Sequence, residues 1–411
     1  MMRTDILVIG GGASGITAAC EAKKTCPRAD VVICERLDRI GKKLLATGNG
    51  KCNLSNKGLS PENYHGSVDA LRYIGDTPSA DVFFAESGIL CTADEQGRMY
   101  PYSGSAASVL NALRLRIKAL GVTELCGFEV KDIARAKNSF SVVSADGRSI
   151  ECRRLIIASG GYAAPNMGTD GSVLRLLRGK GIRTEKIVPA VAPLRVDSES
   201  VKGLKGVRAK CVVRACADGK VLREEKGEVQ FTENSLSGIC VFNMAYLFGE
   251  YDDRLRLEFD LAPDMSLGEI ETYIDSIVKL RSDSELNELL TGIFCKNLAV
   301  YLVKTTLKRP MTESVSGVTA SDIKSLAKRI KKCTFSVTGA SPWQNAQATL
   351  GGVSAEEITD ELELERMKGA YLCGEILDTV GDCGGYNLQW AWSSGMTAGR
   401  NCALSLKGEL K

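Results

Sequence analysis

Three glycines near the start of the chain, Gly10, Gly12 and Gly15, have the spacing G-x-G-x-x-G. They follow an apolar stretch over residues 6–9, and a second apolar stretch delivers Glu35 twenty residues after Gly15. In this layout the first glycine allows a tight turn, the second lets the backbone approach a pyrophosphate, and the third lets the helix lie close to the strand. The N–H groups at the helix N-terminus favour phosphate, and Glu35 can accept hydrogen bonds from a ribose. The pattern therefore predicts an adenine dinucleotide site.

A second glycine-rich segment lies near the other end of the sequence. Gly374 and Glu375 end an apolar stretch, which places a carboxylate at the carboxyl edge of a sheet, where α/β folds bind ligands. In flavoproteins such an acid commonly holds the ribityl chain. Gly384 and Gly385 precede a helical pattern whose dipole favours negative charge at the flavin N1/C2=O edge. A buried strand–turn–helix with Glu375 as a cap explains this segment alone equally well, but both segments together predict FAD.

The chain has a single histidine, His65, which limits the groups that can transfer protons. Hydride transfer is the chemistry of the flavin itself, so proton transfer falls to tyrosine, carboxylate, lysine, arginine, cysteine or water. Tyr386, directly after the second glycine pair, is our candidate catalytic residue as the proton donor. Covalent flavin attachment usually needs histidine or cysteine, so we expect non-covalent FAD, and we interpret His65 as a surface loop residue.

Two absences narrow the chemistry further. No second G-x-G-x-x-G follows a strand, so we expect no separate NAD(P) domain like that of glutathione reductase, and an NAD(P)H electron donor would have to bind transiently. Cys52 has no second cysteine within four residues, whereas flavin disulfide reductases normally use two, so we interpret it as structural. With one histidine and no C-x-x-C, the sequence predicts no metal site.

Composition bounds the class of protein. Hydrophobic residues make up 44% of the 411 residues, and 53 Lys and Arg against 50 Asp and Glu leave a formal charge of +3, which does not favour a polyanionic partner. The 15 cysteines lack the spacings of a secreted framework and predict reduced thiols. No apolar run reaches the about 18 residues needed to span a membrane, and the first strand begins too early for a signal peptide. We expect a cytoplasmic protein with a small-molecule substrate and no membrane partner.

Residues 301–332 are strongly basic, with eight Lys or Arg against two Asp or Glu. Basic helices are usually solvated faces, and the segment lacks the aromatic interleaving typical of proteins that bind single strands. It is the only feature that points to nucleic acid, which we do not favour as a partner.

Hydrophobic periodicity predicts the elements that position the glycine segments. We expect a helix over residues 103–120 and three short antiparallel strands over 128–133, 140–143 and 150–157. The last strand returns to the sheet at a glycine turn.

The middle of the chain has a different pattern of side chains. Residues 188–262 alternate β-branched and polar side chains, which is typical of a small antiparallel sheet or barrel. Ser266 and Glu269 form a capping-box pattern that opens a helical region, and residues 335–338 form a strand that returns to the barrel.

These patterns predict an α/β protein in which a Rossmann-type FAD-binding domain of the glutathione-reductase-like kind is interrupted by an insertion. The domain boundaries we expect are 1–187 and 341–411 for the FAD-binding domain, 188–262 and 333–340 for a β-barrel-like module, and 263–332 for a helical module.

The chain resembles the BaiN/RdsA-type NAD(P)/FAD-dependent oxidoreductases, a family that includes aminoacetone oxidase-like flavoproteins. The resemblance covers nearly the whole chain and rests on the strings GKKLLATGNGKCNLSN, ASGGYAAP, TLGGVSAEEI and CGEILDTVGDCGGYNLQWAWSSGMTAG. One departure is Glu233, which stands where the family often has histidine.

The resemblance implies a set of cofactor-binding residues. The ADP half of FAD is assigned to Gly10, Gly12, Ala13, Ser14, Gly15, Glu35 and Arg36, and the border of the adenosine to Gly160 and Gly161. The flavin side is assigned to Lys43, Leu44, Thr47, Gly48, Asn49, Cys52 and Asn53. The ribityl-isoalloxazine is assigned to Gly374, Glu375, Asp378, Gly385, Tyr386, Asn387 and Leu388.

The reaction we expect is reduction, or formation, of an activated C=C bond in a small hydrophobic substrate by hydride transfer through flavin N5, with the inserted module capping the isoalloxazine. An amine or aminoketone oxidase that uses O2 is the enzymatic alternative. A flavin-dependent RNA-modifying or nucleic-acid-associated protein is the alternative from another class.

Overall fold

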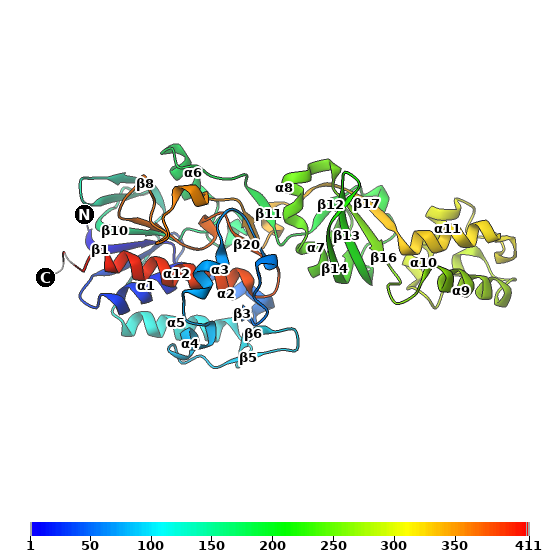
Figure 1. The fold of residues 1–411 in the computed structure, drawn as a ribbon, viewed down its shortest axis with the longest axis horizontal. Coiled ribbons are helices and arrows are strands. Elements are labelled where there is room, and N and C mark those ends of the chain that lie inside the picture. Colours follow the sequence, from blue (N-terminus) through cyan, green and yellow to red (C-terminus); the bar gives the residue numbers. More distant parts are fainter. Residues whose placement is uncertain (1, 408, 410–411) are drawn as a thin grey trace. The chain divides into compact units, whose positions relative to one another are not determined.

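The computed structural model describes residues 2–407 and 409, and the chain divides into two compact units. Unit 1 joins Met1–Ala190 to Trp343–Lys411, and unit 2 is Val191–Pro342. The chain therefore leaves unit 1 once and returns to it, as the colours of Figure 1 show by bringing the blue and red ends of the sequence together. Unit 2 is an insertion that contains both the barrel and the helices assigned above to two modules.

Unit 1 is built on a seven-stranded sheet with the order β7-β2-β1-β10-β9-β8, in which β19 also pairs with β10. The pairs β1–β2, β2–β7, β1–β10 and β10–β19 are parallel, and the pairs made by β9 are antiparallel. The strands are β1 (Met2–Ile9), β2 (Val31–Glu35), β7 (Thr123–Cys126), β8 (Val130–Arg135), β9 (Phe140–Ser144), β10 (Ser149–Ile157) and β19 (Ala370–Leu372).

Strand β10 joins the antiparallel and the parallel parts of this sheet, and its two halves have different patterns of burial. Residues 149–152 pair with β9 and alternate between buried and partly exposed side chains, whereas Leu155, Ile156 and Ile157 pair with β19 and are all buried. Alternation is typical of a sheet with one wet face, and a continuous apolar run is typical of a parallel strand covered on both faces. The predicted three-strand meander is thus continuous with the Rossmann sheet.

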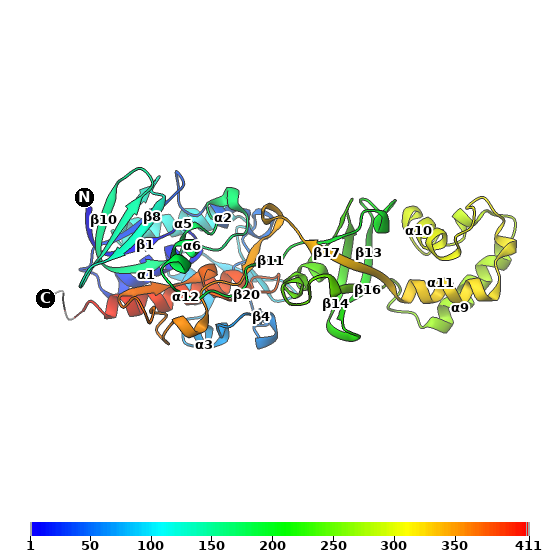
Figure 2. The same ribbon diagram turned by 90° about the horizontal axis from the view of Figure 1, so that it is seen from above.

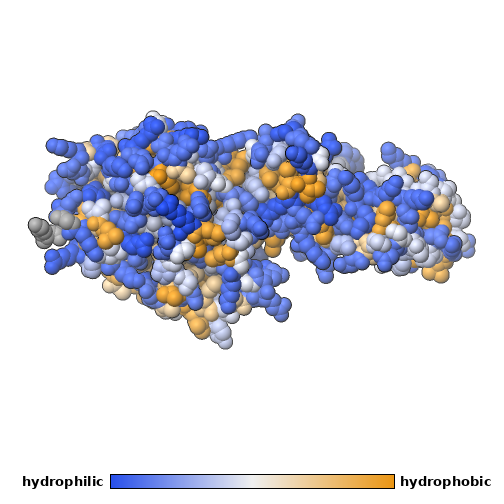
Figure 3. All heavy atoms as spheres, in the orientation of Figure 1, coloured by the Kyte–Doolittle hydropathy of each residue, from blue (hydrophilic) through white to orange (hydrophobic). Residues whose placement is uncertain are grey.

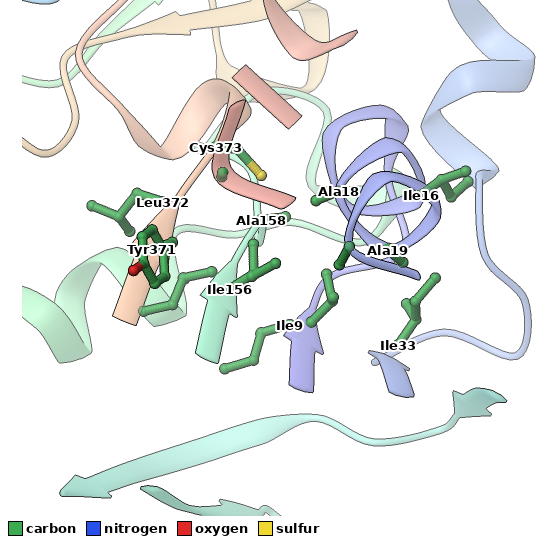
Figure 4. Packing of buried hydrophobic residues seen from close by; sticks show 14 of the residues in the cluster. Ile9, Ile16, Ala18, Ala19, Ile33, Ile156, Ala158, Tyr371, Leu372 and Cys373 are labelled. Atoms are coloured by element: carbon green, nitrogen blue, oxygen red, sulfur yellow. The ribbon is translucent and has the colours of Figure 1, made fainter. Parts of the chain in front are cut away.

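Helices α1 (Ala13–Thr25) and α12 (Tyr386–Leu404) pack closely against each other beside this sheet (Figures 1 and 2). A Cβ on Gly395 would lie 2.6 Å from the Ser14 carbonyl oxygen, and one on Gly399 would lie 2.3 Å from that of Ala18. The two glycines, four residues apart on one helix face, let the backbones approach. Figure 4 shows the core on the strand side, where side chains of α1 lie over β1 and β10.

The remaining elements of unit 1 are short. Its other helices are α2 (Lys42–Ala46), α3 (Ala70–Gly75), α4 (Ala80–Ala85), α5 (Ala106–Ala119) and α6 (Ser172–Gly179). Its small sheets pair β3 (Ser55–Asn56) and β5 (Cys91–Ala93) with β6 (Arg98–Pro101), β4 (Tyr64–His65) with β20 (Val380–Gly381), and β11 (Val188–Ala190) with β18 (Ala348–Leu350). Residues 188–190, expected in the barrel module, therefore pair within unit 1.

Unit 2 begins with a closed antiparallel barrel of order β12-β15-β14-β13-β16-β17. Three aromatic side chains fill its interior, with ring centroids of Phe231, Phe259 and Phe335 lying 5.7–6.3 Å apart. The strands are β12 (Leu194–Val196), β13 (Arg208–Ala217), β14 (Lys220–Phe231), β15 (Ser235–Ser237), β16 (Arg256–Asp260) and β17 (Cys333–Ala340), with the short helices α7 (Ile239–Phe242) and α8 (Phe248–Tyr251) between β15 and β16.

The longer helices of unit 2 are α9 (Leu267–Leu280), α10 (Lys296–Leu307) and α11 (Ala320–Lys331). The predicted capping box is confirmed, because the Ser266 hydroxyl accepts from the Glu269 N–H and the Glu269 carboxylate accepts from the Ser266 N–H. Thr319 and Asp322 cap α11 in the same way.

The predicted fold class is confirmed: a Rossmann-type α/β unit is interrupted by a β-barrel and helices. The face drawn in Figure 3 is mainly hydrophilic, with scattered apolar patches. Among the described residues, none of the helices combines the length and apolar character needed to cross a bilayer.

Candidate functional site

The three motif glycines have different surroundings. Gly10 has φ +101°, and a Cβ there would lie 2.4 Å from the Ala158 carbonyl oxygen. A Cβ on Gly15 would lie 1.9 Å from the Gly10 carbonyl oxygen, so this glycine allows α1 to approach β1. Around Gly12, by contrast, no described atom lies within 4 Å of the Cβ position. Gly10 and Gly15 are therefore required by the fold. Gly12 faces open space, which a ligand needs in order to contact the backbone there.

Glu35 ends β2 and is tied to the glycine turn. One carboxylate oxygen accepts from the Gly11 N–H at 2.9 Å, and the other accepts from the Leu37 N–H at 3.0 Å. Since an ionised carboxylate has about four acceptor positions, capacity remains for a ribose. Arg36, by contrast, makes ion pairs with Glu129 at 2.8 Å and Asp170 at 3.0 Å, so its guanidinium holds neighbouring segments together.

The turn after β10 contributes both glycines assigned to the adenosine. Gly160 has φ +75°, and Thr169 donates from its hydroxyl to the Gly161 carbonyl oxygen. A Cβ on Gly161 would lie 2.5 Å from the Thr349 hydroxyl and 3.0 Å from Oε1 of Glu375. This turn therefore lies close to the glycine-rich segment near the C-terminus.

Lys43 and Glu375 form an ion pair that joins segments 332 residues apart, with Nζ 2.7 Å from Oε2. The other oxygen of Glu375 is buried and lacks a hydrogen-bond partner among the described residues. Gly374 precedes it with φ +77°, and a Cβ there would lie 2.3 Å from the Ser14 hydroxyl. The Trp390 indole donates to the Gly374 carbonyl at 3.1 Å, which fixes the turn against α12.

The loop assigned to the flavin side has an unusual backbone. Gly48, Asn49 and Cys52 all have φ between +54° and +60°, a region that non-glycine residues rarely adopt. Strain of this kind often marks a binding site. The loop is held by hydrogen bonds from the Thr47 hydroxyl to the Leu44 carbonyl at 2.6 Å and from the Cys52 N–H to the Thr47 carbonyl at 3.0 Å. Gly48 and Asn49 are exposed, so the loop presents its backbone to solvent.

Cys52 itself is fully buried, and burial raises its pKa to about 11. A thiol with that pKa is protonated at neutral pH and is a poor nucleophile. The geometry favours the structural interpretation of this cysteine.

The turn before α12 packs tightly against the backbone of β3. Gly385 has φ +103°, and a Cβ there would lie 2.2 Å from the Ser55 carbonyl oxygen. The Asn387 side chain accepts from the Gly381 N–H at 2.9 Å and donates to the Gly381 carbonyl at 2.7 Å, which closes the turn. Tyr386 begins α12, and its hydroxyl donates to the Gly58 carbonyl at 3.4 Å. Leu388 lies half-buried in the same first turn.

Two predicted residues have structural contacts that sequence reasoning missed. Asp378 is buried, which raises its pKa, and its two oxygens accept from the Ser67 N–H at 2.7 Å and the Gly351 N–H at 2.9 Å. It therefore ties two loops together. His65 is not a loop residue on the surface: it lies in β4 with its Nε2 3.1 Å from an oxygen of Asp382. That partner is 317 residues away, so no local signal in the sequence identifies it.

The residues present fit FAD. Seven buried side-chain N or O atoms of the described residues lack a hydrogen-bond partner, and three of them belong to the segments assigned to the cofactor: Asn53 Oδ1, Ser159 Oγ and Glu375 Oε1. Buried polar atoms are rarely left unsatisfied in proteins. A ligand with many hydroxyl and carbonyl groups would provide the missing partners, and the open space at Gly12 would admit its phosphates.

The Rossmann-type unit and this set of groups define an FAD-dependent oxidoreductase. The sequence matches the HI0933-like protein Rossmann domain family over residues 4–401. The chain belongs to this family, and the resemblance inferred from the sequence strings is confirmed.

Curated relatives of the whole chain have two different activities in their names. The chain is 35% identical over 405 residues to the 3-dehydro-bile acid delta(4,6)-reductase of Clostridium scindens, covering 96% of this chain and 98% of that protein. It is 26% identical over 416 residues to the ribosomal RNA dihydrouridine synthase of Haemophilus influenzae, covering 97% and 98%. Among solved structures, the 3-ketosteroid delta1-dehydrogenase of Sterolibacterium denitrificans aligns with a TM-score of 0.49 at 13% identity, covering 98% of this chain and 100% of that one.

Proposed function

We propose that this protein uses non-covalent FAD to reduce a C=C bond conjugated to a carbonyl group in a small hydrophobic substrate. The observation that carries the proposal is the likeness over the whole chain to a delta(4,6)-reductase. The second relative supports the same chemistry, because a dihydrouridine is a uridine whose ring C=C has been reduced, and that bond is also conjugated to a carbonyl. An activated C=C bond is thus common to the reactions named for the two relatives, and only the molecule that carries this bond differs.

When bound, FAD supplies hydride transfer at flavin N5. The chain's own residues would bind and orient it: the turn at Gly12 and the N-terminus of α1 would hold the phosphates, and Glu35 would accept from the ribose. The unsatisfied oxygen of Glu375 would accept from a ribityl hydroxyl, while Lys43 holds the other oxygen at 2.7 Å. The N-terminus of α12 stabilises negative charge, and Tyr386 supplies the proton to the substrate.

We propose NAD(P)H as the reductant. Since the chain has no second dinucleotide motif, NAD(P)H would bind only transiently. The measurement is anaerobic: purified holoenzyme is mixed with NADH, NADPH or aminoacetone, and flavin absorbance is followed. We expect bleaching by one of the nicotinamides and reoxidation by a steroid enone. Bleaching by aminoacetone, with peroxide formed on admission of O2, would instead establish the oxidase alternative.

RNA is the second candidate substrate, and one structural observation favours it. Helices α10 and α11, with the residue that caps the end of α10, carry exposed lysines that make no ion pair among the described residues, namely Lys296, Lys304, Lys308, Lys324 and Lys328. Lysines free of carboxylates can neutralise backbone phosphates. Reoxidation of the reduced flavin by uridine-containing RNA but not by the steroid enone, with a strong dependence on salt, would establish this substrate in place of the small one.

A further inference from the structure

Two cysteines from different elements of unit 2 lie side by side in its interior. Cys211 belongs to β13, Cys240 lies in α7, and both are free thiols that are 1% exposed. Cys211 is directly opposite Gly227 of β14, and a Cβ on Gly227 would lie 3.0 Å from the Cys240 Cβ and 3.4 Å from its Sγ. Directly opposed residues share a face of the sheet, with Cβ positions about 4.5–5.5 Å apart. The Cys240 side chain therefore occupies the space beside Cys211 that a side chain at position 227 would fill.

The two thiols interact, and the interaction makes them chemically unequal. A hydrogen bond from the Cys211 thiol to the Cys240 sulfur lowers the pKa of Cys240, although burial and the charge of Glu225 act against it. The same bond, together with burial and the charge of Asp260, raises the pKa of Cys211. The thiolate is the reactive form of a cysteine. Cys240 is therefore the nucleophile of the pair, and Cys211 is the thiol placed to react with it afterwards.

The element that covers the pair is short. Helix α7 has four residues, and Ile239, directly before Cys240, is 49% exposed. Isolated helical turns are marginally stable in water, and short elements open locally at a lower free energy than the whole domain unfolds. Opening of α7 alone exposes the Cys240 thiol to a small reagent while β13 and β14 stay paired.

We propose that Cys211 and Cys240 form a site of reversible oxidation, at which a hydroperoxide such as hydrogen peroxide converts the two thiols into a disulfide between β13 and α7. The inference goes beyond the proposed function and does not depend on it.

The reaction proceeds in two steps. The Cys240 thiolate attacks one oxygen of the peroxide, the O–O bond breaks, and the other oxygen leaves as hydroxide, which gives a sulfenic acid on Cys240. The Cys211 sulfur then attacks the Cys240 sulfur, the S–O bond breaks, and the hydroxyl group leaves as water with the proton of the Cys211 thiol. The two thiols lose two electrons in total, and one hydrogen peroxide is reduced to two waters. A dithiol reductant reverses the change by thiol–disulfide exchange.

The test identifies the bond directly in the wild-type holoenzyme. Protein reduced with dithiothreitol and freed of it is treated with increasing hydrogen peroxide. Remaining thiols are then alkylated, and the unreduced digest is analysed by mass spectrometry. The exposed Cys295 serves as an internal monitor that the oxidant has acted. We expect a pair of peptides joined through Cys211 and Cys240, which separates on reduction. Recovery of both cysteines as alkylated thiols, in protein whose Cys295 is oxidised, would overturn the proposal.

Variants assign the roles of the two sulfurs. Cys240→Ser should form no joined peptides and leave Cys211 as a free thiol, whereas Cys211→Ser should stop at a sulfenic acid on Cys240, which dimedone traps. The matched control is Cys333→Ser, which removes another buried thiol from the same barrel and should form the disulfide as wild type does. Dimedone on Cys211 in Cys240→Ser, and none on Cys240 in Cys211→Ser, would contradict the assignment of the nucleophile.

A second measurement on the wild-type protein needs no substitution. A disulfide constrains the unfolded chain, so denaturant should unfold unit 2 of the oxidised protein at a higher concentration than that of the reduced protein, followed by circular dichroism. Identical transitions in the two forms would show that no such cross-link exists in unit 2. Flavin content and bleaching by NAD(P)H are measured separately on the reduced protein, so a failure of the proposed function is distinguished from a failure of this site.

Discussion

The two units of this protein differ in how they achieve close packing. In unit 1, a Cβ on Gly15, Gly374 or Gly385 would lie 1.9–2.3 Å from a neighbouring atom. In unit 2 such a contact occurs at Gly238, whose Cβ would lie 2.2 Å from the Glu228 carbonyl oxygen, but Gly203 and Gly268 have no described atom within 4 Å of their Cβ positions, and phenylalanine side chains fill the barrel interior. Unit 1 therefore relies more on close backbone contacts, which occur in the glycine turns assigned to the cofactor. Unit 2 packs side chain on side chain, which serves a scaffold.

The largest expected effect comes from filling a backbone contact in unit 1. Gly15→Val places a side chain 1.9 Å from the Gly10 carbonyl oxygen, so α1 cannot lie against β1. We expect little folded protein and no bound FAD, measured by thermal melting and by flavin absorbance. Gly268→Ala in the first turn of α9, where the Cβ position is open, is the matched control and should melt as wild type does.

The Gly12→Val variant distinguishes an effect on folding from an effect on cofactor binding. Its Cβ position is open among the described residues, so the unit should fold with near wild-type stability and fail to retain FAD. A Gly12→Val protein with full flavin occupancy would show that the phosphates bind elsewhere.

The next largest effect comes from a substitution that disrupts the packing of unit 2. Phe259→Ala removes a buried ring, and such changes cost about 3–5 kcal/mol. All three tryptophans, Trp343, Trp390 and Trp392, lie in unit 1, so tryptophan fluorescence reports on that unit alone. We expect denaturant to melt an early fraction of the circular dichroism signal without a change in fluorescence.

Phe84→Ala is the matched change in unit 1, since Phe84 contacts Trp392 with ring centroids 5.2 Å apart. It should shift the fluorescence transition instead. If both variants move both signals together, the two units unfold as one and the contrast between them has no thermodynamic meaning.

A smaller effect concerns the proton donor in the turn before α12. General-acid groups contribute typically 10²–10⁴-fold, so Tyr386→Phe should slow reoxidation by substrate by at least about 10² while FAD content and spectrum stay normal. Tyr64→Phe removes the neighbouring hydroxyl, which donates to the Tyr386 carbonyl at 3.2 Å, and should change the rate little. Stopped-flow measurement of the reoxidation step gives both rates. An unchanged rate in Tyr386→Phe would remove this residue as the acid.

The smallest effect is on the adenosine side. Hydrogen bonds to a charged group contribute about 1.5–3 kcal/mol, so Glu35→Ala should weaken FAD binding about tenfold or more. Part of the loss comes from the glycine turn, because the Gly11 N–H loses its acceptor at 2.9 Å. Titration of the apoprotein with FAD gives the affinity, and Glu35→Gln should recover part of it.

The sequence predicted the features that depend on local order. The glycine spacing, the strand that delivers Glu35 and the cap at Ser266 each involve neighbours in the chain, and the structure has them. The barrel was predictable because residues 188–262 alternate with a period of two, although α7 and α8 were not. Strand β7 was missed, since Thr123–Cys126 is short and has no long apolar run.

Contacts between distant segments could not be predicted. The pairs Lys43–Glu375 and His65–Asp382 join residues 332 and 317 positions apart. Their formation depends on how the two separated segments of unit 1 come together, which neither residue type nor spacing reveals. The cofactor roles of the individual residues remain predictions that the FAD measurements above decide.

The packing of α1 on α12 also fixes an order of events during synthesis. The first glycine turn leaves the ribosome early, but its partners in β19 and α12 are made only after all of unit 2. Domains generally fold as units while the chain is still being made. The barrel unit can therefore be complete while the first half of unit 1 still lacks its closing strand and helix. If FAD binds as proposed, a chain that stops before residue 386 has the turn assigned to the ADP half but lacks the turn and helix assigned to the flavin half.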